Sequence, residues 1–190
     1  MSVRSLMRCM SSQNNITLES KDSITALISL GANLPSRFGT PVQTLSAAIA
    51  SIAGFGNGEL FASSFYQTEA VDCPPETPDF INAVVAVPLP KSITASELLD
   101  FLQELEKEFG RSHDVVKNSP RNLDLDVLYF GNQLFTSHQM EIPHPRAAQR
   151  RFVIEPLTEI APNLVLPGQS VSVQALLETL PICPKVTKLH

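Results

Sequence analysis

The chain has 190 residues, of which 43% are hydrophobic and 17% charged, proportions that are ordinary for one globular domain with its own core. Its formal net charge of −5 argues against general attraction to nucleic acid or to an anionic membrane. Three cysteines without a C-x-x-C pattern provide neither a disulfide framework nor a zinc site, and no apolar run reaches transmembrane length, so a reducing cytoplasmic location is expected.

Residues 1–22 differ in composition from the rest of the chain. They carry Arg4 and Arg8 among small and polar residues, and no acid precedes Glu19. The long apolar segment of a secretory signal is missing from them. We therefore expect a disordered N-terminal extension, with a transit peptide as the alternative, followed by a single domain over residues 23–185.

The domain begins with a strand and an amphipathic helix. Residues 24–30 form a short apolar run that leads into the sequence GANL, which indicates a strand followed by a turn out of the sheet. Thr40 and Gln43 have the spacing of a capping box, and apolar residues recur behind them at helical intervals. We therefore predict a helix that begins after Thr40 and ends at Gly54.

Two more strands and a second helix follow. The strands are predicted over residues 59–68 and 79–87, with a stiff proline-rich loop between them. Phe80 and Asn82 share one face of the later strand, so an aromatic ring lies beside an amide, although a core phenylalanine is the simpler local explanation. A second capping box and an apolar stripe predict a helix over residues 94–109.

The segment from Pro120 to Gly131 is an apolar run that contains two acids. It has the composition of a strand, and side chains alternate across a strand, so Asp124 and Asp126 share one face. Neighbouring carboxylates repel each other, and a Mg²⁺ ion between them, with Arg121 at the rim, would compensate that repulsion. An edge strand with two solvated acids remains an alternative at this point. The apolar positions that should face the core are Leu123, Leu125 and Val127.

The remaining segments are predicted from weaker signals. Gln103 and Glu106 lie one turn apart on a flanking face of the second helix, where solvated polar residues are the usual explanation. Residues 133–135 are expected to pair back on the preceding strand as a hairpin. A short helix up to about Ile160 and one or two turns over residues 172–180 complete the chain.

The predicted order β-α-β-β-α-β is that of an α+β, ferredoxin-like split βαβ sandwich. Both long helices would cover one face of an antiparallel sheet. The other face would be left for the catalytic loops around Gly31, Pro75, Lys117 and His144. Because six of the 14 basic residues lie between positions 111 and 151, a local anion site is possible within this acidic protein.

Several separate segments occur in an order that is more specific than any one of them. They are Ser29–Leu34, Ser64–Thr68, Pro78–Ala83, Gly110-Arg111, Pro120–Asn132, Ile142–Arg146 and Arg150–Leu157. From residue 24 to about residue 180, the chain resembles the pterin pyrophosphokinases of folate biosynthesis.

This resemblance implies transfer of a pyrophosphoryl group from ATP to 6-hydroxymethyl-7,8-dihydropterin, with release of AMP. It implies that two Mg²⁺ ions, held at Asp124 and Asp126, accompany ATP as co-substrate, and that Arg111 and Arg121 complete the catalytic set. The residues suit this chemistry, because displacement at phosphorus needs positioning and charge stabilisation rather than a protein nucleophile. Two such ions would lie roughly 3.5–4 Å apart.

The resemblance also implies how the two substrates are divided over the chain. In the family the pterin lies between two aromatic rings and its edge is recognised by an asparagine. The corresponding pterin-binding positions are Thr68, Val71, Phe80, Asn82 and Phe152. The corresponding ATP-binding positions are Gln103, Glu106, Arg111, Arg121, His144 and Arg150.

Two positions depart from some relatives. Asn118 replaces a tryptophan and Pro145 replaces a tyrosine, which puts the closure of the nearby loop in doubt. A non-catalytic ferredoxin-like binding module and a Mg²⁺-dependent phosphohydrolase are the alternatives, and only AMP formation that requires the pterin would separate all three. We expect a monomer that binds ATP and the pterin.

Overall fold

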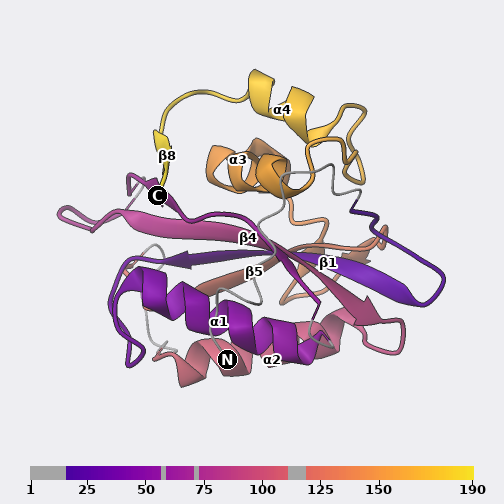
Figure 1. Ribbon diagram of the computed structural model, residues 1–190, viewed down its shortest axis with the longest axis horizontal. Coiled ribbons are helices and arrows are strands. Elements are labelled where there is room, and N and C mark those ends of the chain that lie inside the picture. The colour runs from indigo at the N-terminus through magenta and orange to yellow at the C-terminus, as the bar shows by residue number, and fades with distance from the viewer. Residues whose placement is uncertain (1–15, 57–58, 71–72, 111–118) are drawn as a thin grey trace.

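An antiparallel sheet lies at the centre of the structure (Figure 1). The computed structural model describes residues 16–56, 59–70, 73–110 and 119–190. The strands are β1 (Ser23–Ala32), β2 (Phe61–Ala62), β3 (Tyr66–Thr68), β4 (Phe80–Pro90), β5 (Asp124–Phe130), β6 (Phe135–Thr136), β7 (Glu141–Ile142) and β8 (Val186–Lys188). The helices are α1 (Pro41–Phe55), α2 (Ala95–Glu108), α3 (Arg151–Ile160) and α4 (Val173–Thr179), and Ala147–Gln149 form a 3-10 turn.

The main sheet has the strand order β5-β1-β4-β3-β8, and β2 pairs with β4 beside this path. β1 lies between β4 and β5 and is antiparallel to both. Its position explains why nine of its ten residues are buried, since a central strand is covered along both edges as well as on both faces. The order β1-α1-β2/β3-β4-α2-β5 confirms the predicted split βαβ arrangement.

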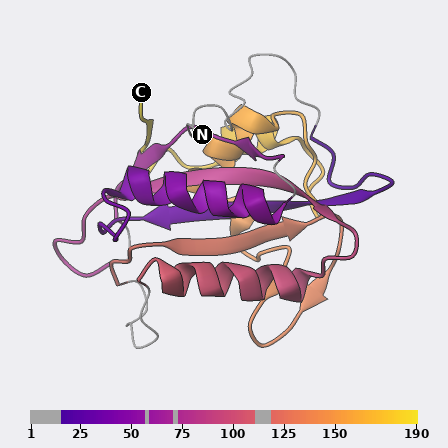
Figure 2. The ribbon, with the colours of Figure 1, turned by 60° about the horizontal axis from the view of Figure 1, so that its bottom comes forward.

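Helices cover both faces of the sheet (Figures 1 and 2). α1 and α2 pack side by side on one face, as predicted, around a core that includes Ile28, Val85 and Val127. We expected the other face to carry only loops, and this prediction was incomplete. α3 and α4 cover part of it, because alternate strand residues such as Val84 and Leu128 are apolar on this side as well.

Both long helices begin as the sequence predicts. The Thr40 side chain accepts the N–H of Gln43, whose side chain in turn accepts the N–H of Thr40, and Thr94 forms the same capping box with Glu97. α1 ends at Phe55, one residue beyond the predicted Gly54, because Gly56 supplies the cap. In the described part of the chain, no helix combines the length and the apolar character needed to cross a bilayer.

The predicted strand over residues 59–68 is divided into β2 and β3. Ser63 interrupts it: its main-chain N–H donates to the carbonyl of Val84, while its side-chain oxygen accepts the N–H of Val84. The side chain therefore replaces a main-chain partner at this point, and regular pairing with β4 resumes only at Tyr66. The predicted hairpin at residues 133–135 was also wrong, because Phe135 pairs with Ile142 of β7 rather than with β5.

The two predicted domain boundaries differ from the structure. Residues 16–22 were assigned to a disordered extension, but Leu18 is buried in the core on the α3 face and its carbonyl accepts the N–H of Thr25. Residues 1–15 lie outside the described residues. At the other end, β8 continues the main sheet past residue 185 because its main chain pairs with β3.

Replacement of the α2 cap gives a test of this local structure. Thr94→Ala removes the acceptor for the N–H of Glu97 and should lower the free energy of unfolding by about 1 kcal/mol, measured by urea denaturation. Ser96→Ala, at an exposed position inside the same helix, should change it by much less. Equal losses in the two variants would show that the capping box does not stabilise α2.

Candidate active site

The strand register brings the candidate residues onto one face of the sheet. Gly31 of β1 pairs with Asp124 on one side and with Asn82 on the other, and Asn82 pairs in turn with Tyr66. Asp126 lies opposite Ser29 in the next row of the same face. Residues directly opposite each other on neighbouring strands point to the same side, so both acids face the side that α3 partly covers.

An arginine accompanies each of the two acids. Arg121 Nη1 lies 2.8 Å from Asp124 Oδ1, and Arg150 Nη1 lies 3.8 Å from Asp126 Oδ2. The Asp126 side chain keeps 40% of its surface exposed, and that of Asp124 keeps 27%. Both carboxylates therefore keep part of their surface open to a ligand from the solvent side, and the two guanidinium groups beside them suit phosphate oxygens.

The segment after β7 places an imidazole beside this charged group. The main-chain N–H of His144 donates to Leu128 O at 2.9 Å, which attaches the segment to the outer edge of β5. His144 Nδ1 accepts the N–H of Arg146, so the neutral ring carries its proton on Nε2. Burial lowers the pKa of His144, and Arg150 and Arg146 lower it further against the opposing effect of Asp126. The ring is therefore a neutral donor at physiological pH.

The pterin-side candidates lie along β3 and β4. Asn82 Nδ2 donates to Thr68 Oγ1 at 2.9 Å, and both side chains are buried. A Cβ atom on Gly31 would lie 3.2 Å from Asn82 Oδ1, so a side chain at Gly31 would crowd the amide. Phe80, half-buried at the start of β4, points to the same face as Asn82. An amide edge is therefore held beside an aromatic ring.

Phe152 approaches from the other side, on the first turn of α3. It is half-buried and packs against the core on the α3 face, and the Arg150 guanidinium lies 5.4 Å from the centre of its ring. This contact has cation–π geometry. The start of α3 therefore brings an aromatic ring and a guanidinium group to the same face as Phe80 and Asn82.

Glu106 departs from the local expectation of a solvated residue. Only 7% of it is exposed, and its Oε1 accepts the main-chain N–H of Leu125 at 2.7 Å. β5 is the outermost strand of the sheet on this side, so this N–H lacks a strand partner and the carboxylate supplies one. Gln103, one turn earlier on α2, is half-buried. Glu106 thus supports the strand segment that carries both acids.

Two of the candidate residues, Val71 and Arg111, lie outside the described residues. The structure brings the other eleven site candidates to one end and one face of the sheet or, for Gln103 and Glu106, to α2 beside β5. The assignment of these residues to the pterin or to the nucleotide stays a prediction, and local sequence patterns had favoured ordinary explanations for Phe80 and Glu106.

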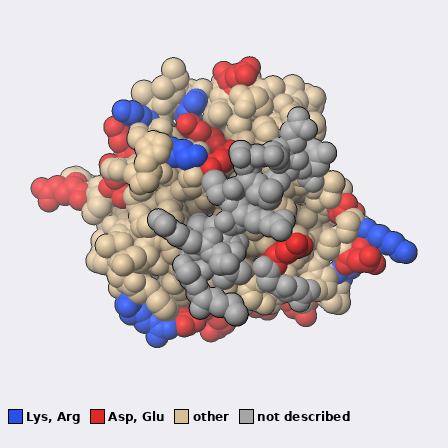
Figure 3. All heavy atoms as spheres, in the orientation of Figure 1, with Lys and Arg blue, Asp and Glu red and all other residues tan. Residues whose placement is uncertain are grey.

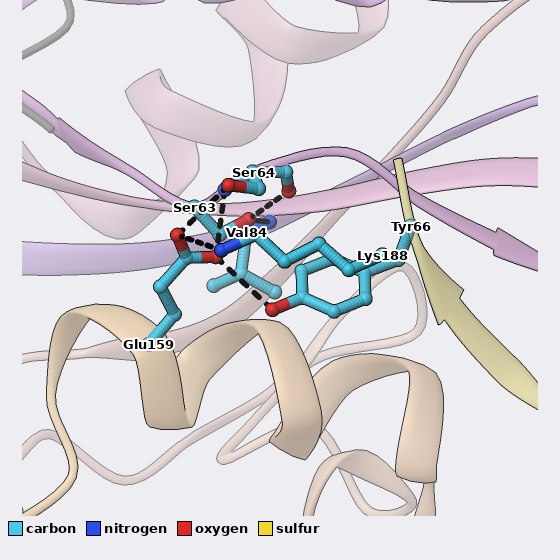
Figure 4. A network of polar contacts seen from close by, with 6 residues as sticks. All are labelled: Ser63, Ser64, Tyr66, Val84, Glu159 and Lys188. Atoms are coloured by element: carbon cyan, nitrogen blue, oxygen red, sulfur yellow. Dashed lines mark hydrogen bonds and ion pairs between the residues drawn. The ribbon is translucent and has the colours of Figure 1, made fainter. Parts of the chain in front are cut away.

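Sequence reasoning missed Glu159, which joins α3 to the edge of the sheet (Figure 4). Its carboxylate accepts four hydrogen bonds: from the N–H and hydroxyl of Ser64, from the Tyr66 hydroxyl, and from Lys188 Nζ of β8, all at 2.8–3.0 Å. Nothing in the local sequence marks this residue, since Ser64 and Tyr66 are more than 90 positions away.

The Glu159 network has a clear electrostatic balance. Burial by itself would raise the pKa of Glu159, but the hydrogen bonds from Lys188, Ser64 and Tyr66 outweigh it and lower the pKa below the usual 4.5. The same neighbourhood raises the pKa of Tyr66, through burial first and the Glu159 charge second. Glu159 is therefore ionised at neutral pH and attaches α3, with Phe152 on it, to β3.

The acids fit a Mg²⁺ site of the kind that is completed by a substrate. Within residues 16–56, 59–70, 73–110 and 119–190, no group of three or more His, Cys, Asp or Glu side chains could enclose a metal ion. Asp124 and Asp126 supply two hard oxygen donors on one face instead. Mg²⁺ is commonly held by one or two carboxylates together with phosphate oxygens and water. The donor set therefore suits Mg²⁺ that arrives with a nucleotide.

Comparison with known sequences identifies relatives over most of the chain. A family model described as 7,8-dihydro-6-hydroxymethylpterin-pyrophosphokinase matches residues 27–162. The 2-amino-4-hydroxy-6-hydroxymethyldihydropteridine pyrophosphokinase of Haemophilus influenzae is 40% identical over 149 residues, which cover 78% of this chain and 88% of that protein. The protein of the same name from Synechocystis is 36% identical over 154 residues, covering 80% and 74% of the two chains.

Solved structures show the same fold at lower sequence similarity. A crystal structure of Plasmodium falciparum HPPK-DHPS A437G with STZ-DHP superposes with a TM-score of 0.59 and 12% identity. The match covers 87% of this chain and 47% of that longer one. At this level of identity the likeness supports the arrangement of helices and strands alone.

The Glu159 network predicts a pH-dependent contribution to stability. A carboxylate whose pKa is lowered in the folded state stabilises the fold above the unfolded-state pKa of about 4.5, and this contribution is lost as the pH falls through the folded-state pKa. Glu159→Gln should therefore reduce the free energy of unfolding by about 1–3 kcal/mol at pH 7, and the gap to the wild type should narrow below pH 4.5.

Urea denaturation at pH 7, 5 and 3.5 measures this gap, with Glu178→Gln on the exposed side of α4 as the control. The control should stay within about 0.5 kcal/mol of the wild type at each pH. A Glu159→Gln deficit that has the same size at pH 7 and pH 3.5 would contradict an ionised Glu159 as the cause.

Proposed function

Since this chain belongs to the 7,8-dihydro-6-hydroxymethylpterin-pyrophosphokinase family, we propose that it transfers the pyrophosphoryl group of ATP to 6-hydroxymethyl-7,8-dihydropterin in folate synthesis. The products are AMP and the pterin diphosphate. The single observation that supports this assignment most directly is the register of the sheet, in which Gly31 has Asp124 on one side and Asn82 on the other. A charged, phosphate-suited half-site and an amide-and-ring half-site thus share one face.

Charge is the central problem of this reaction. The pterin hydroxymethyl oxygen forms a new bond to the β-phosphorus while the bond from that phosphorus to the oxygen bridging the α-phosphate breaks. Asp124 and Asp126 are proposed to hold two Mg²⁺ ions, which when bound neutralise phosphate charge and align the reacting oxygens. Arg121 and Arg150 flank the two acids, where guanidinium groups can bind phosphate oxygens at both sides of the breaking bond.

The other nucleotide contacts come from three segments. His144 offers its Nε2 proton to a phosphate without adding a net charge, because its pKa is lowered. Gln103 and Glu106 of α2, together with Arg111, are proposed to bind ATP as in the family. Glu106 also accepts the N–H of Leu125, so the same carboxylate would contact the nucleotide and hold β5 in place.

The pterin is proposed to lie between the rings of Phe80 and Phe152, with its edge against Asn82 and with Thr68 and Val71 lining the pocket. The bond to Thr68 occupies one N–H of Asn82 and leaves its carbonyl oxygen and other N–H for the ligand. A planar heterocycle with alternating donors and acceptors matches that amide edge. Stacking adds about 0.5–1.5 kcal/mol beyond the burial of the rings.

The proposed setting of the enzyme follows from the composition of the chain. A monomeric, cytoplasmic protein with one catalytic domain suits that composition. Among the described residues on the face drawn in Figure 3, acidic and basic side chains are interspersed and do not gather into one patch of either sign. This distribution gives no support to a nucleic acid partner.

The proposed function is tested by separating AMP formation from ATP hydrolysis. Purified protein with MgATP should release AMP and the pterin diphosphate only when 6-hydroxymethyl-7,8-dihydropterin is present. A phosphohydrolase would consume ATP without the pterin, and a binding module would leave ATP intact. Either of these results would overturn the assignment.

The metal-binding pair gives the first prediction for catalysis. Asp124→Asn or Asp126→Asn should each reduce kcat on the order of 100-fold or more at saturating Mg²⁺, because an amide cannot replace the charge of a carboxylate ligand. The fold should persist, since both side chains are partly exposed. Asp100→Asn on the exposed face of α2 is the matched control. A variant of either site that keeps more than a tenth of wild-type kcat would remove that acid from the mechanism.

The aromatic pair Phe80 and Phe152 gives a prediction for binding of the pterin. Phe80→Ala and Phe152→Ala should each raise the dissociation constant of the pterin roughly tenfold through lost stacking and lost burial, and leave that of MgATP within about twofold. Titration calorimetry with each ligand measures both constants. Equal weakening of the two ligands would mean that the rings only fill the core.

A further inference from the structure

Asn33 follows β1 directly and lies at the meeting point of the two half-sites. Only 4% of it is exposed, and its side-chain amide is bonded at both ends. Nδ2 donates to Pro78 O at 3.1 Å, and Oδ1 accepts the N–H of Arg121 at 2.7 Å. A carbonyl can only accept and an N–H can only donate, so these two partners define the orientation of the amide.

The main chain at this point makes further bonds to one of the same partners. The N–H groups of Asn33 and Leu34 both donate to Arg121 O at 3.1 Å. The peptide groups on either side of Arg121 are therefore held through both N–H and carbonyl, while its side chain reaches Asp124. The position from which that guanidinium extends is set by Asn33 and its neighbour.

The Asn33 side chain continues the hydrogen bonding of β1 beyond its last paired residue. β1 is bonded along both edges up to Ala32 and Gly31, whose partners are Ile81 and Asp124. One residue later the amide bridges to the segments that enter β4 and β5. These partners are 45 and 88 positions away in the sequence. Among side chains, only Asn and Gln provide the donor and acceptor of a peptide group in one plane.

Each bridged segment leads directly to one half-site. Pro78 lies two residues before Phe80 and four before Asn82, the proposed ring and edge contacts of the pterin. Arg121 lies three residues before Asp124, on the nucleotide side. We propose that Asn33 is a positioning residue that holds the pterin half-site and the nucleotide half-site at one separation. This inference rests on the proposed function, because it concerns the same two ligands.

The two bonds of the amide can be tested one at a time. Asn33→Asp keeps an acceptor for the N–H of Arg121 but loses the donor to Pro78, and it places a carboxylate oxygen against a carbonyl oxygen. Its expected effect is confined to the pterin side: a dissociation constant for the pterin raised about tenfold, with that of the nucleotide changed less than twofold. Asn33→Ala loses both bonds and should weaken pterin binding and lower kcat together.

A matched control lies at the other end of the same strand. Thr25 is 6% exposed, and its Oγ1 donates to Thr17 O at 2.8 Å. Thr25→Val also removes one buried hydrogen bond from a side chain on or next to β1, but far along the strand from the paired acids. It should lower stability to a similar extent and leave kcat and both dissociation constants at wild-type values.

The measurements are urea denaturation, steady-state kinetics, and calorimetry with the pterin and with the α,β-methylene analogue of ATP, in which the bond that breaks is blocked. Asn33→Ser, whose hydroxyl is too short to bridge both partners, replaces Asn33→Asp if the latter does not fold. The proposal is supported if Asn33→Asp binds the pterin more weakly but the nucleotide as tightly as the wild type, and if Thr25→Val binds both ligands normally.

Wild-type affinities in Asn33→Asp or its replacement, or parallel losses in Asn33 and Thr25 variants, would show that the Asn33 bonds serve stability alone. That result is distinct from failure of the proposed function. In the latter case the wild-type protein itself would form no AMP from ATP and the pterin.

Discussion

The site depends on the register in which β1 lies between β4 and β5. Because side chains alternate along a strand, a shift of either neighbour by one residue would turn Asp124 and Asp126, or Phe80 and Asn82, into the apolar core. The register is held by apolar residues on both faces of all three strands, and the cost of exposing them excludes the shifted pairings. The alignment of the two half-sites is therefore a consequence of core packing.

The second face of the sheet combines a core with a site. Under α3 and α4 it is apolar and covered, whereas toward the end of β1 it carries acids, an amide and two partly buried arginine side chains. α3 crosses between these regions, so that Val153 and Leu157 pack inward while Phe152 and Arg150 reach the site. Glu159 bonds the last turn of α3 to Ser64 and to Tyr66 of β3. These bonds also position the first turn of the helix, which carries Phe152.

Charge in the site is balanced before any ligand binds. Each acid has an arginine near it, and the His144 imidazole stays neutral because burial and the nearby Arg150 and Arg146 lower its pKa. In the proposed reaction a triphosphate with its metal ions would replace these internal pairs, with the guanidinium groups bound to phosphate and the carboxylates to metal. The main chain of Arg121 is held during such an exchange, because it is bonded to Asn33 at both its N–H and its carbonyl.

Local sequence was sufficient for features that depend on neighbours within a few positions. The structure confirms the two capping boxes and the shared face of Asp124 and Asp126. It also confirms the burial of Leu123, Leu125 and Val127 on the opposite face, as strand periodicity predicted. The order of elements also implied the split βαβ fold. Ordered motifs pointed to the family, but only as a resemblance, because no single motif is specific.

The tertiary structure decided everything that depends on partners distant in sequence. Glu159 and the Asn33 side chain have partners that are 29 to 95 positions away, so no periodicity could predict their hydrogen bonds. Glu106 looked solvated because helical spacing does not show that an unpaired edge of β5 needs an acceptor. Phe135 pairs with Ile142 rather than with β5, and α3 and α4 cover a face that was expected to be open. In each case a buried hydrogen-bonding group or apolar surface is satisfied by whichever segment the completed fold brings to it.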